Sequence, residues 1–177
     1  MPANLRDILL TRSSKQEMIR FMEDHPEAFD EALQLSMLNE EQYSWRAAWL
    51  VNHSMNKDDA RVKSHIEAIT DSIPGKSDGH IRELMKILLQ MQPGDDEEGK
   101  IFDLAISTWE QAGRQPSVRQ VAFRLIVKSV EKHPELANEI DFLTEEQYLE
   151  PLSEGIKCSV LNMIGHLKKI SKNQKDF

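Results

Sequence analysis

Four cationic side chains recur at nearly regular intervals in this sequence, and each directly follows an apolar residue. The intervals between successive cations are 36, 37 and 38 residues. The four apolar–cation pairs are Trp45-Arg46, Ile81-Arg82, Val118-Arg119 and Ile156-Lys157. Placed along a groove, such a row of cations could bind an acidic peptide or a phosphate group.

These four cations could instead have a structural role, in which each one reaches a carboxylate or a carbonyl in a neighbouring turn. A planar guanidinium can hold two acceptors, and acidic turn residues such as Asp78 and Glu154 are available. Each cation falls within the apolar arc of its expected helix, where an unpaired charge would be costly. We therefore favour a ladder of structural contacts between repeating units.

Positive charge is also concentrated in residues 114–132, which contain five basic residues and one acidic residue. Arg124, Lys128 and Lys132 are spaced i, i+4, i+8 and so share one helix face, which could contact the phosphates of a nucleic acid. A solvated helix surface is the more ordinary interpretation. With Glu83, which we also expect to be exposed, these three residues are our candidates for a partner-binding face.

Two tryptophans, Trp45 and Trp49, form an i, i+4 pair on one helix face, and Trp109 stands apart. An exposed aromatic pair could stack on a base or on the ring of a ligand. Aromatic residues more often fill the seam between helices, and here Ala47 and Ala48 lie beside the pair. We therefore expect these aromatic side chains to pack in the core.

The sequence contains no motif that predicts catalysis, a cofactor or a metal ion. Its six histidines include no HExxH or paired spacing, so metal binding has little support. Residues 73–77 imitate the end of a phosphate-binding loop, but Thr70 replaces the first glycine and no strand is expected before it. Cys158 has no evident general base nearby, and we expect a packed thiol.

The composition is that of an ordinary globular protein, with 177 residues, 40% apolar and 29% charged. The net charge of −8 argues against a general binder of nucleic acid or anionic membranes, because such partners attract a basic surface. One cysteine excludes an intramolecular disulfide. No stretch resembles a signal peptide or a membrane span, so we expect a cytoplasmic protein without a membrane partner.

Hydrophobic periodicity indicates an all-helical chain. Residues 116–131 begin with Pro116 and place apolar residues at i, i+3, i+4 spacing over a wide arc. Ser14 and Glu17 form a capping box for an early helix. Residues 58–73 place four apolar residues on one helical stripe, and the last helix is expected to end near residue 170.

The apolar–cation pairs mark the second helix of a repeating hairpin of about 37 residues. A second recurring segment supports the repeat, because His25-Pro-Glu27 recurs as His133-Pro-Glu135. The proline after each histidine also suggests a turn role for both histidines. Stacked hairpins bury apolar stripes that one hairpin cannot bury alone. We predict a right-handed α-α superhelix of about four hairpins plus an N-terminal helix pair.

Within this frame the sequence resembles the HEAT repeat family, and in particular small bacterial HEAT-like proteins of unassigned function. The segments that carry the resemblance are SWRAAWLVNHS, HIRELMKILLQM, PSVRQVAFRLIVKSVEKHPELANEI and SEGIKCSVLNMI. Lys157 in place of Arg, and the charged Glu83 and Lys86, depart from the family pattern. The resemblance implies an α-solenoid. It also implies an alternative function, because HEAT-like proteins of DNA alkylation repair bind duplex DNA on a basic concave face.

We predict a single domain over residues 1–170, with a divergent helix pair at its start and a flexible tail after it. The approximate bounds are 3–24 for the pair, 26–55, 58–92, 95–132 and 134–170 for the repeats, and 171–177 for the tail. We expect the second helices to line the concave side. The leading functional hypothesis is a non-catalytic module that binds or scaffolds a protein or peptide. Duplex DNA bound by helix 116–132 is the alternative.

Overall fold

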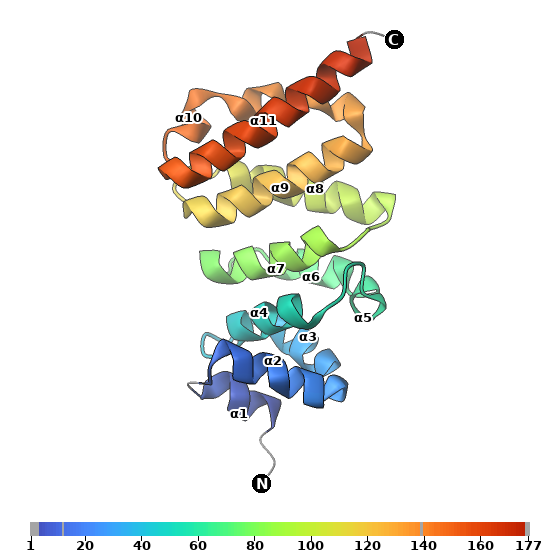
Figure 1. Ribbon diagram of the computed structural model, residues 1–177, viewed down its shortest axis with the longest axis vertical. Helices are drawn as coiled ribbons and strands as arrows, with labels where there is room; N and C mark the ends of the chain where they lie inside the picture. Colours follow the sequence, from blue (N-terminus) through green and yellow to red (C-terminus); the bar gives the residue numbers. More distant parts are fainter. Residues whose placement is uncertain (1–3, 12, 139, 176–177) are drawn as a thin grey trace. The chain divides into compact units, whose positions relative to one another are not determined.

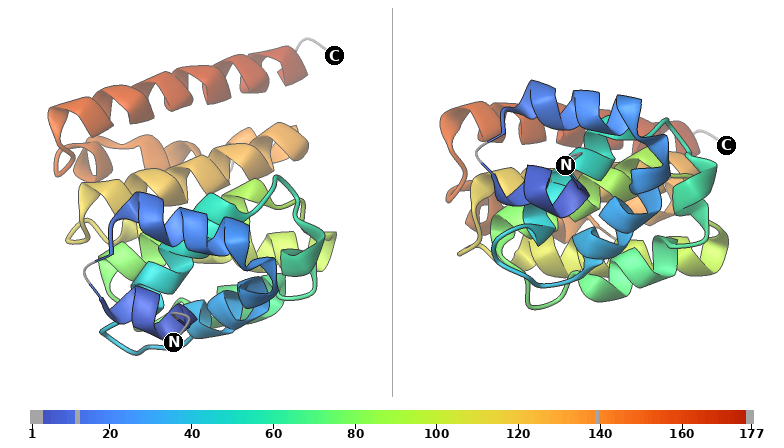
Figure 2. Two further views of the ribbon diagram at one scale, coloured as in Figure 1. Left: turned by 60° about the horizontal axis from the view of Figure 1, so that its bottom comes forward. Right: turned by 90° about the horizontal axis from the view of Figure 1, so that it is seen from below.

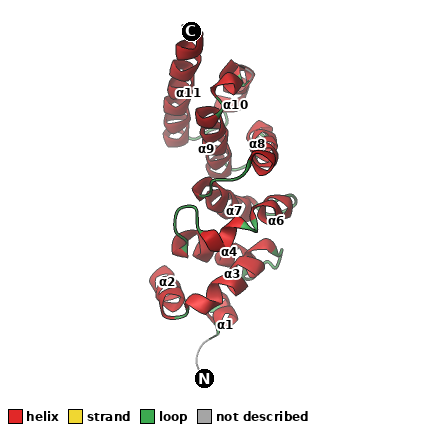
Figure 3. Ribbon diagram, turned by 90° about the vertical axis from the view of Figure 1, so that its right-hand side faces the viewer, coloured by secondary structure: helices red, strands yellow, loops and turns green. Residues whose placement is uncertain are grey.

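The computed structural model describes residues 4–11, 13–138 and 140–175. All regular elements over these residues are helices and none is a strand (Figure 3), so the all-α prediction is confirmed for the described chain. The chain divides into two compact units, residues 1–97 and 98–177. That both units belong to one domain over residues 1–170 stays a prediction.

Unit 1 contains three helical hairpins in two layers. The second helices α2, α4 and α7 lie side by side in one layer, and α3 and α6 lie in the other (Figures 1 and 3). The elements are α1 (Leu5–Leu10), α2 (Lys15–Asp24), the 3-10 helix η1 (Pro26–Ala28), α3 (Phe29–Met37), α4 (Ser44–Ser54), α5 (Ala60–Lys63), α6 (Ile66–Ser72) and α7 (Asp78–Gln90).

Local sequence explains where several of these helices begin. The predicted capping box at α2 is confirmed, because the Ser14 amide donates to Glu17 Oε2 at 2.6 Å and the Glu17 amide donates to Ser14 Oγ at 3.2 Å. Two amides that the helix itself leaves unpaired are thereby satisfied. These two hydrogen bonds fix the start of α2, which places Lys15 in its first turn.

The expected stripe at residues 58–73 is buried, but its helix is not continuous. Its four apolar residues are at most 1% exposed, which confirms the stripe. The helix is interrupted at Ser64 and His65, where the His65 amide donates to the Val62 carbonyl at 2.8 Å. This i→i+3 bond tightens the turn, and a serine side chain offers the backbone local alternatives to the helix. Two short helices, α5 and α6, result.

Unit 2 contains a long hairpin followed by a less regular one. The elements are α8 (Asp95–Glu110), whose first residues belong to unit 1, α9 (Pro116–Lys132), the 3-10 helices η2 (Pro134–Asn138) and η3 (Asp141–Thr144), α10 (Glu146–Leu149) and α11 (Glu154–Lys175). Helices α9 and α11 pack side by side, as Figure 1 and the left view of Figure 2 show. Helix α9 buries apolar residues around most of its circumference, as its wide apolar arc predicts.

Helix α11 continues to Lys175, five residues beyond the predicted end at residue 170. The predicted end of the last helix near residue 170 is therefore wrong, whereas the flexible tail over residues 171–177 stays a prediction. Residues 171–175 contain no Gly or Pro, so nothing in the local sequence ends the helix there. Residues 176–177, the rest of the expected tail, lie outside the described residues.

Candidate functional site

Two of the four recurrent cations donate to backbone carbonyls. Arg46 on α4 donates from Nη1 to the Thr11 carbonyl at 2.7 Å and from Nη2 to the Ser13 carbonyl at 3.4 Å. These carbonyls lie after α1, where a helix leaves its last acceptors unpaired. Arg46 therefore ties α4 to the preceding helix pair.

Arg119 on α9 is fully buried. Its Nε donates to the Trp109 carbonyl at 2.9 Å, its Nη2 donates to the Tyr148 carbonyl at 2.8 Å, and its guanidinium lies 4.5 Å from the centre of the Trp109 ring. Burial lowers the pKa of Arg119, because a low-dielectric interior disfavours the charged form. Arg119 thus links the end of α8 to α10.

The other two cations pair with carboxylates. Arg82 Nε lies 3.1 Å from Glu83 Oε1, and Lys157 Nζ lies 3.5 Å from Glu146 Oε1. The Lys157 pair is largely exposed and contributes little to stability. All of these contacts support a structural role, but that the four cations form one regular ladder stays a prediction.

The expectation that Glu83 is an exposed contact residue is wrong. Glu83 is 1% exposed and lies between Arg82 Nε and Lys86 Nζ, each 3.1 Å from its Oε1. A carboxylate can be buried when two cations neutralise it, and Lys86 on the next turn of the helix supplies the second one. The charged residues that depart from the family pattern in this helix therefore form one ion-pair cluster.

The predicted basic face of α9 is only partly available to a ligand. Arg124 is exposed and Lys128 is half-buried. Lys132 pairs with Glu98, which also lies 3.4 Å from His133 Nε2. A phosphate would have to compete with the Glu98 carboxylate for Lys132. The role of these three residues as a partner-binding face stays a prediction.

The expectation that all three tryptophans pack in the core holds only for Trp109. Its ring is buried against Phe123, 4.6 Å between centroids, and its Nε1 donates to the Leu143 carbonyl at 2.9 Å. In contrast, Trp45 is 45% exposed and Trp49 is half-buried. Their helix α4 presents its alanines Ala47 and Ala48 to the core instead, so the aromatic side chains point elsewhere.

Trp45 and Trp49 line a groove of about 580 Å³ on the layer of α2, α4 and α7. The groove combines an aromatic wall with charged side chains from all three helices. Its lining consists of Ser13, Lys15, Met18, Trp45, Arg46, Trp49, His53, Arg82, Glu83 and Lys86. Four permanent cations face one carboxylate in this set, so the groove is locally basic in a chain of net charge −8.

The half-buried Trp49 already has contacts within the groove. His53 stacks on it with ring centroids 4.0 Å apart, and the Lys15 ammonium lies 5.6 Å from its ring centre. The ammonium is attracted by the negative face of the ring. Lys15 is itself exposed, and Trp45 is more exposed than the half-buried Trp49.

The sequence did not identify three members of this groove, which are Lys15, Met18 and His53. They come from two helices that are not adjacent to α7 in the chain, and no spacing rule joins them to Arg82 or Lys86. The pair of charged residues on α7 could have indicated a polar site, because a charged side chain that faces a neighbouring helix requires polar partners.

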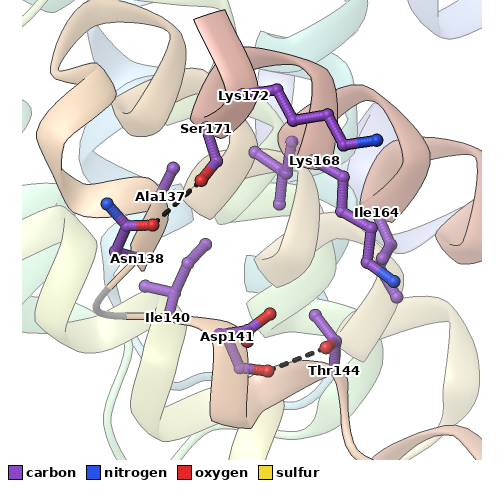
Figure 4. A pocket seen from close by; sticks show the side chains of 10 residues that line it. Ala137, Asn138, Ile140, Asp141, Thr144, Ile164, Lys168, Ser171 and Lys172 are labelled. Carbon is purple, nitrogen blue, oxygen red and sulfur yellow. Dashed lines mark hydrogen bonds between the residues drawn. The ribbon is translucent and has the colours of Figure 1, made fainter. Parts of the chain in front are cut away.

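A second hollow, of about 270 Å³, lies within unit 2 between α11 and the segment of η2 and η3 (Figure 4). Lys168 and Lys172 extend along one side of it from α11, and the Ser171 hydroxyl donates to Asn138 Oδ1 at 2.9 Å across it. Both lysines are exposed. The hollow is smaller than the groove, and the described residues that line it include no aromatic side chain.

Two further expectations from the sequence concern the cysteine and two of the histidines. Cys158 is exposed, so the expectation of a packed thiol is wrong. The turn role of His25 and His133 is confirmed, because each one ends a helix directly before a proline. The Nδ1 atom of each histidine also lies near Oε1 of the glutamate two residues further on, at 3.1 Å for His25 and 3.7 Å for His133.

Where the structure describes the chain, no helix has the length and apolar character of a membrane span.

Helical hairpins stacked in two layers define the class of α-helical repeat proteins. The chain matches the model of a family described as HEAT repeat domain over residues 5–167. Because this match covers most of the 177 residues, the chain belongs to the HEAT repeat family, as its resemblance predicted. Comparisons with curated proteins and with solved structures find no match.

Proposed function

We propose that the chain is a non-catalytic binding module that receives a segment of a partner protein on the layer of α2, α4 and α7. Helical repeats offer extended surfaces for such contacts. The observation that carries the proposal is the exposure of Trp45 in a groove. A large apolar side chain that the chain leaves 45% exposed is the residue type that dominates the energy of protein interfaces.

The surroundings of Trp45 match the anatomy of an interface. Tryptophan and arginine are enriched in protein interfaces and in their energetic centres, and this groove contains two tryptophans and two arginines. Two of its cations, Arg82 and Lys86, are held by Glu83. Side chains that are already ordered lose less entropy when a partner binds.

Site-specific photo-crosslinking in the native cells tests this proposal. A photoreactive phenylalanine analogue at Trp45 should yield a discrete crosslinked protein, which mass spectrometry then identifies. The matched control places the same analogue at Phe142, an aromatic residue of unit 2 that is 47% exposed. No adduct at position 45, or the same adducts at both positions, would contradict the proposal.

Duplex DNA bound by α9 remains the alternative, with less support. Arg119 is buried and Lys132 is paired with Glu98, so fewer cations of this helix can meet phosphates. If DNA is the ligand, a duplex should be retarded in a gel at low salt, and the double substitution Arg124→Glu/Lys128→Glu should abolish the retardation. We expect no retardation.

A further inference from the structure

The geometry of the groove points to a specific partner chemistry: an acidic protein segment that places one large apolar side chain against Trp45. This inference rests on the proposed function and names the kind of segment that the same groove selects. It is carried by the charge of the groove, by the way two of its cations are held, and by its exposed aromatic surface.

The charge of the groove is opposite to that of the chain. Lys15, Arg46, Arg82 and Lys86 line it against the single carboxylate of Glu83, whereas the whole chain carries −8. A short anionic segment is therefore attracted to the groove itself. An extended polyanion would also meet the acidic remainder of the chain, which repels it.

Glu83 acts as a positioning residue for the two cations on α7. Because it is buried and contacts both Arg82 Nε and Lys86 Nζ at 3.1 Å, it holds their charged ends at the wall of the groove. The cluster of two cations and one carboxylate carries a net positive formal charge, which adds to that of Lys15 and Arg46 along the same groove.

Trp45 makes the apolar contact with the partner segment. Trp49 is already stacked on His53 and faced by Lys15, whereas Trp45 is 45% exposed. An aromatic or long aliphatic side chain on Trp45 would bury apolar surface from both partners. A volume of about 580 Å³ lies in the range that accommodates a few side chains, so the occupant is a short segment.

Binding of labelled peptides to the full chain tests the chemistry, with fluorescence anisotropy as the readout. The first peptide carries one Phe flanked by Glu residues, the second replaces Glu with Gln, and the third replaces Phe with Ala. Oligothymidylate of equal charge is the fourth probe. We expect the first peptide to bind roughly tenfold more tightly than each of the others, and to weaken as NaCl rises from about 50 mM to about 300 mM.

A pair of double variants locates the binding. Trp45→Ala/Lys15→Glu should lose roughly tenfold in affinity for the first peptide. Phe142→Ala/Arg20→Glu makes the same change of charge and also removes an exposed aromatic side chain, but outside the groove, and should stay within about twofold. Lys15 lies in the first turn of α2, where a glutamate is compatible with the helix dipole. Circular dichroism checks that both variants are folded.

The inference is overturned if the Gln peptide or oligothymidylate binds as tightly as the first peptide, or if both double variants weaken binding equally. The proposed function fails separately, when the photoreactive residue at Trp45 gives no specific adduct. A specific adduct without preference for the acidic peptide would retain the binding module and reject its acidic partner.

Discussion

At the scale of residues, Lys76 and His80 have a structural role that their sequence context does not indicate. Lys76 Nζ donates to the carbonyls of Met37 and Leu38 at 2.9 Å each, and His80 Nε2 donates to the carbonyl of Ser36 at 2.7 Å. These acceptors end α3, where a helix leaves carbonyls unpaired and favours a cation. The lysine of the loop-like Pro-Gly-Lys-Ser stretch is thus a helix cap.

His80 makes stability depend on pH. Burial lowers the pKa of His80 from its ordinary value of 6.5, and the nearby Lys76 lowers it further. As the pH falls from 6.5 towards the lowered pKa of the folded state, the unfolded chain therefore binds a proton at His80 more readily than the folded chain, so the free energy of unfolding falls.

We expect the stability of the wild type, measured by urea denaturation between about pH 7.5 and 5.5, to fall more steeply than that of His80→Gln, by at most about 1.4 kcal/mol per pH unit. Glutamine keeps a donor for the Ser36 carbonyl. The two proteins differ only at residue 80, so a difference between their pH profiles reports on His80. Parallel pH profiles would contradict this role of His80.

At the scale of elements, α9 depends on a buried cation as well as on its apolar residues. Arg119 joins α8 and α10 through two carbonyls and lies against the Trp109 ring. Its third nitrogen, Nη1, is buried without a hydrogen-bond partner among the described residues. The burial of this charge costs free energy, but the loss of the side chain would leave two buried carbonyls unpaired together with a cavity.

We expect Arg119→Ala to lower the free energy of unfolding by about 3 kcal/mol, as the sum of a cavity and lost hydrogen bonds. Arg119→Lys should cost less but still about 1 kcal/mol, because an ammonium cannot reproduce the planar fork. Arg124→Ala is the control on the same helix, and as an exposed substitution should stay within about 0.5 kcal/mol. Chemical denaturation measures all three, and equal losses for Arg119→Ala and Arg124→Ala would refute the argument.

At the scale of the whole molecule, the boundary between the two units falls inside a helix. Unit 1 ends at residue 97, whereas α8 runs continuously over Asp95–Glu110. A helix that crosses a boundary favours cooperative unfolding, because a short helix is stable only while tertiary packing supports it, so the loss of packing in one unit weakens the helix that both units share. In repeat proteins, stability is shared between neighbouring repeats in this way.

We therefore expect a single unfolding transition. Trp45→Phe/Trp49→Phe leaves Trp109 as the only tryptophan, so that its fluorescence reports unit 2 while far-ultraviolet circular dichroism reports the entire chain. In urea, the two midpoints of this variant should coincide. Separate midpoints would show that the two units unfold independently.

The sequence by itself determined the helical class, the repeat of hairpins and several helix starts. These properties depend on residues close in the chain: the apolar stripe of 58–73, the capping box at Ser14 and the proline at residue 116 each act within a few turns. The recurrence of apolar–cation pairs extended the argument to the HEAT repeat family without tertiary information.

Only the tertiary structure decided which polar and apolar side chains are covered. Glu83 is buried, whereas Trp45 and Cys158 are exposed, each against expectation. A periodic pattern shows which residues share a helix face, but burial depends on which faces a neighbouring helix covers. The groove depends on the same decision, because its charged and aromatic residues come from three helices that only packing brings together.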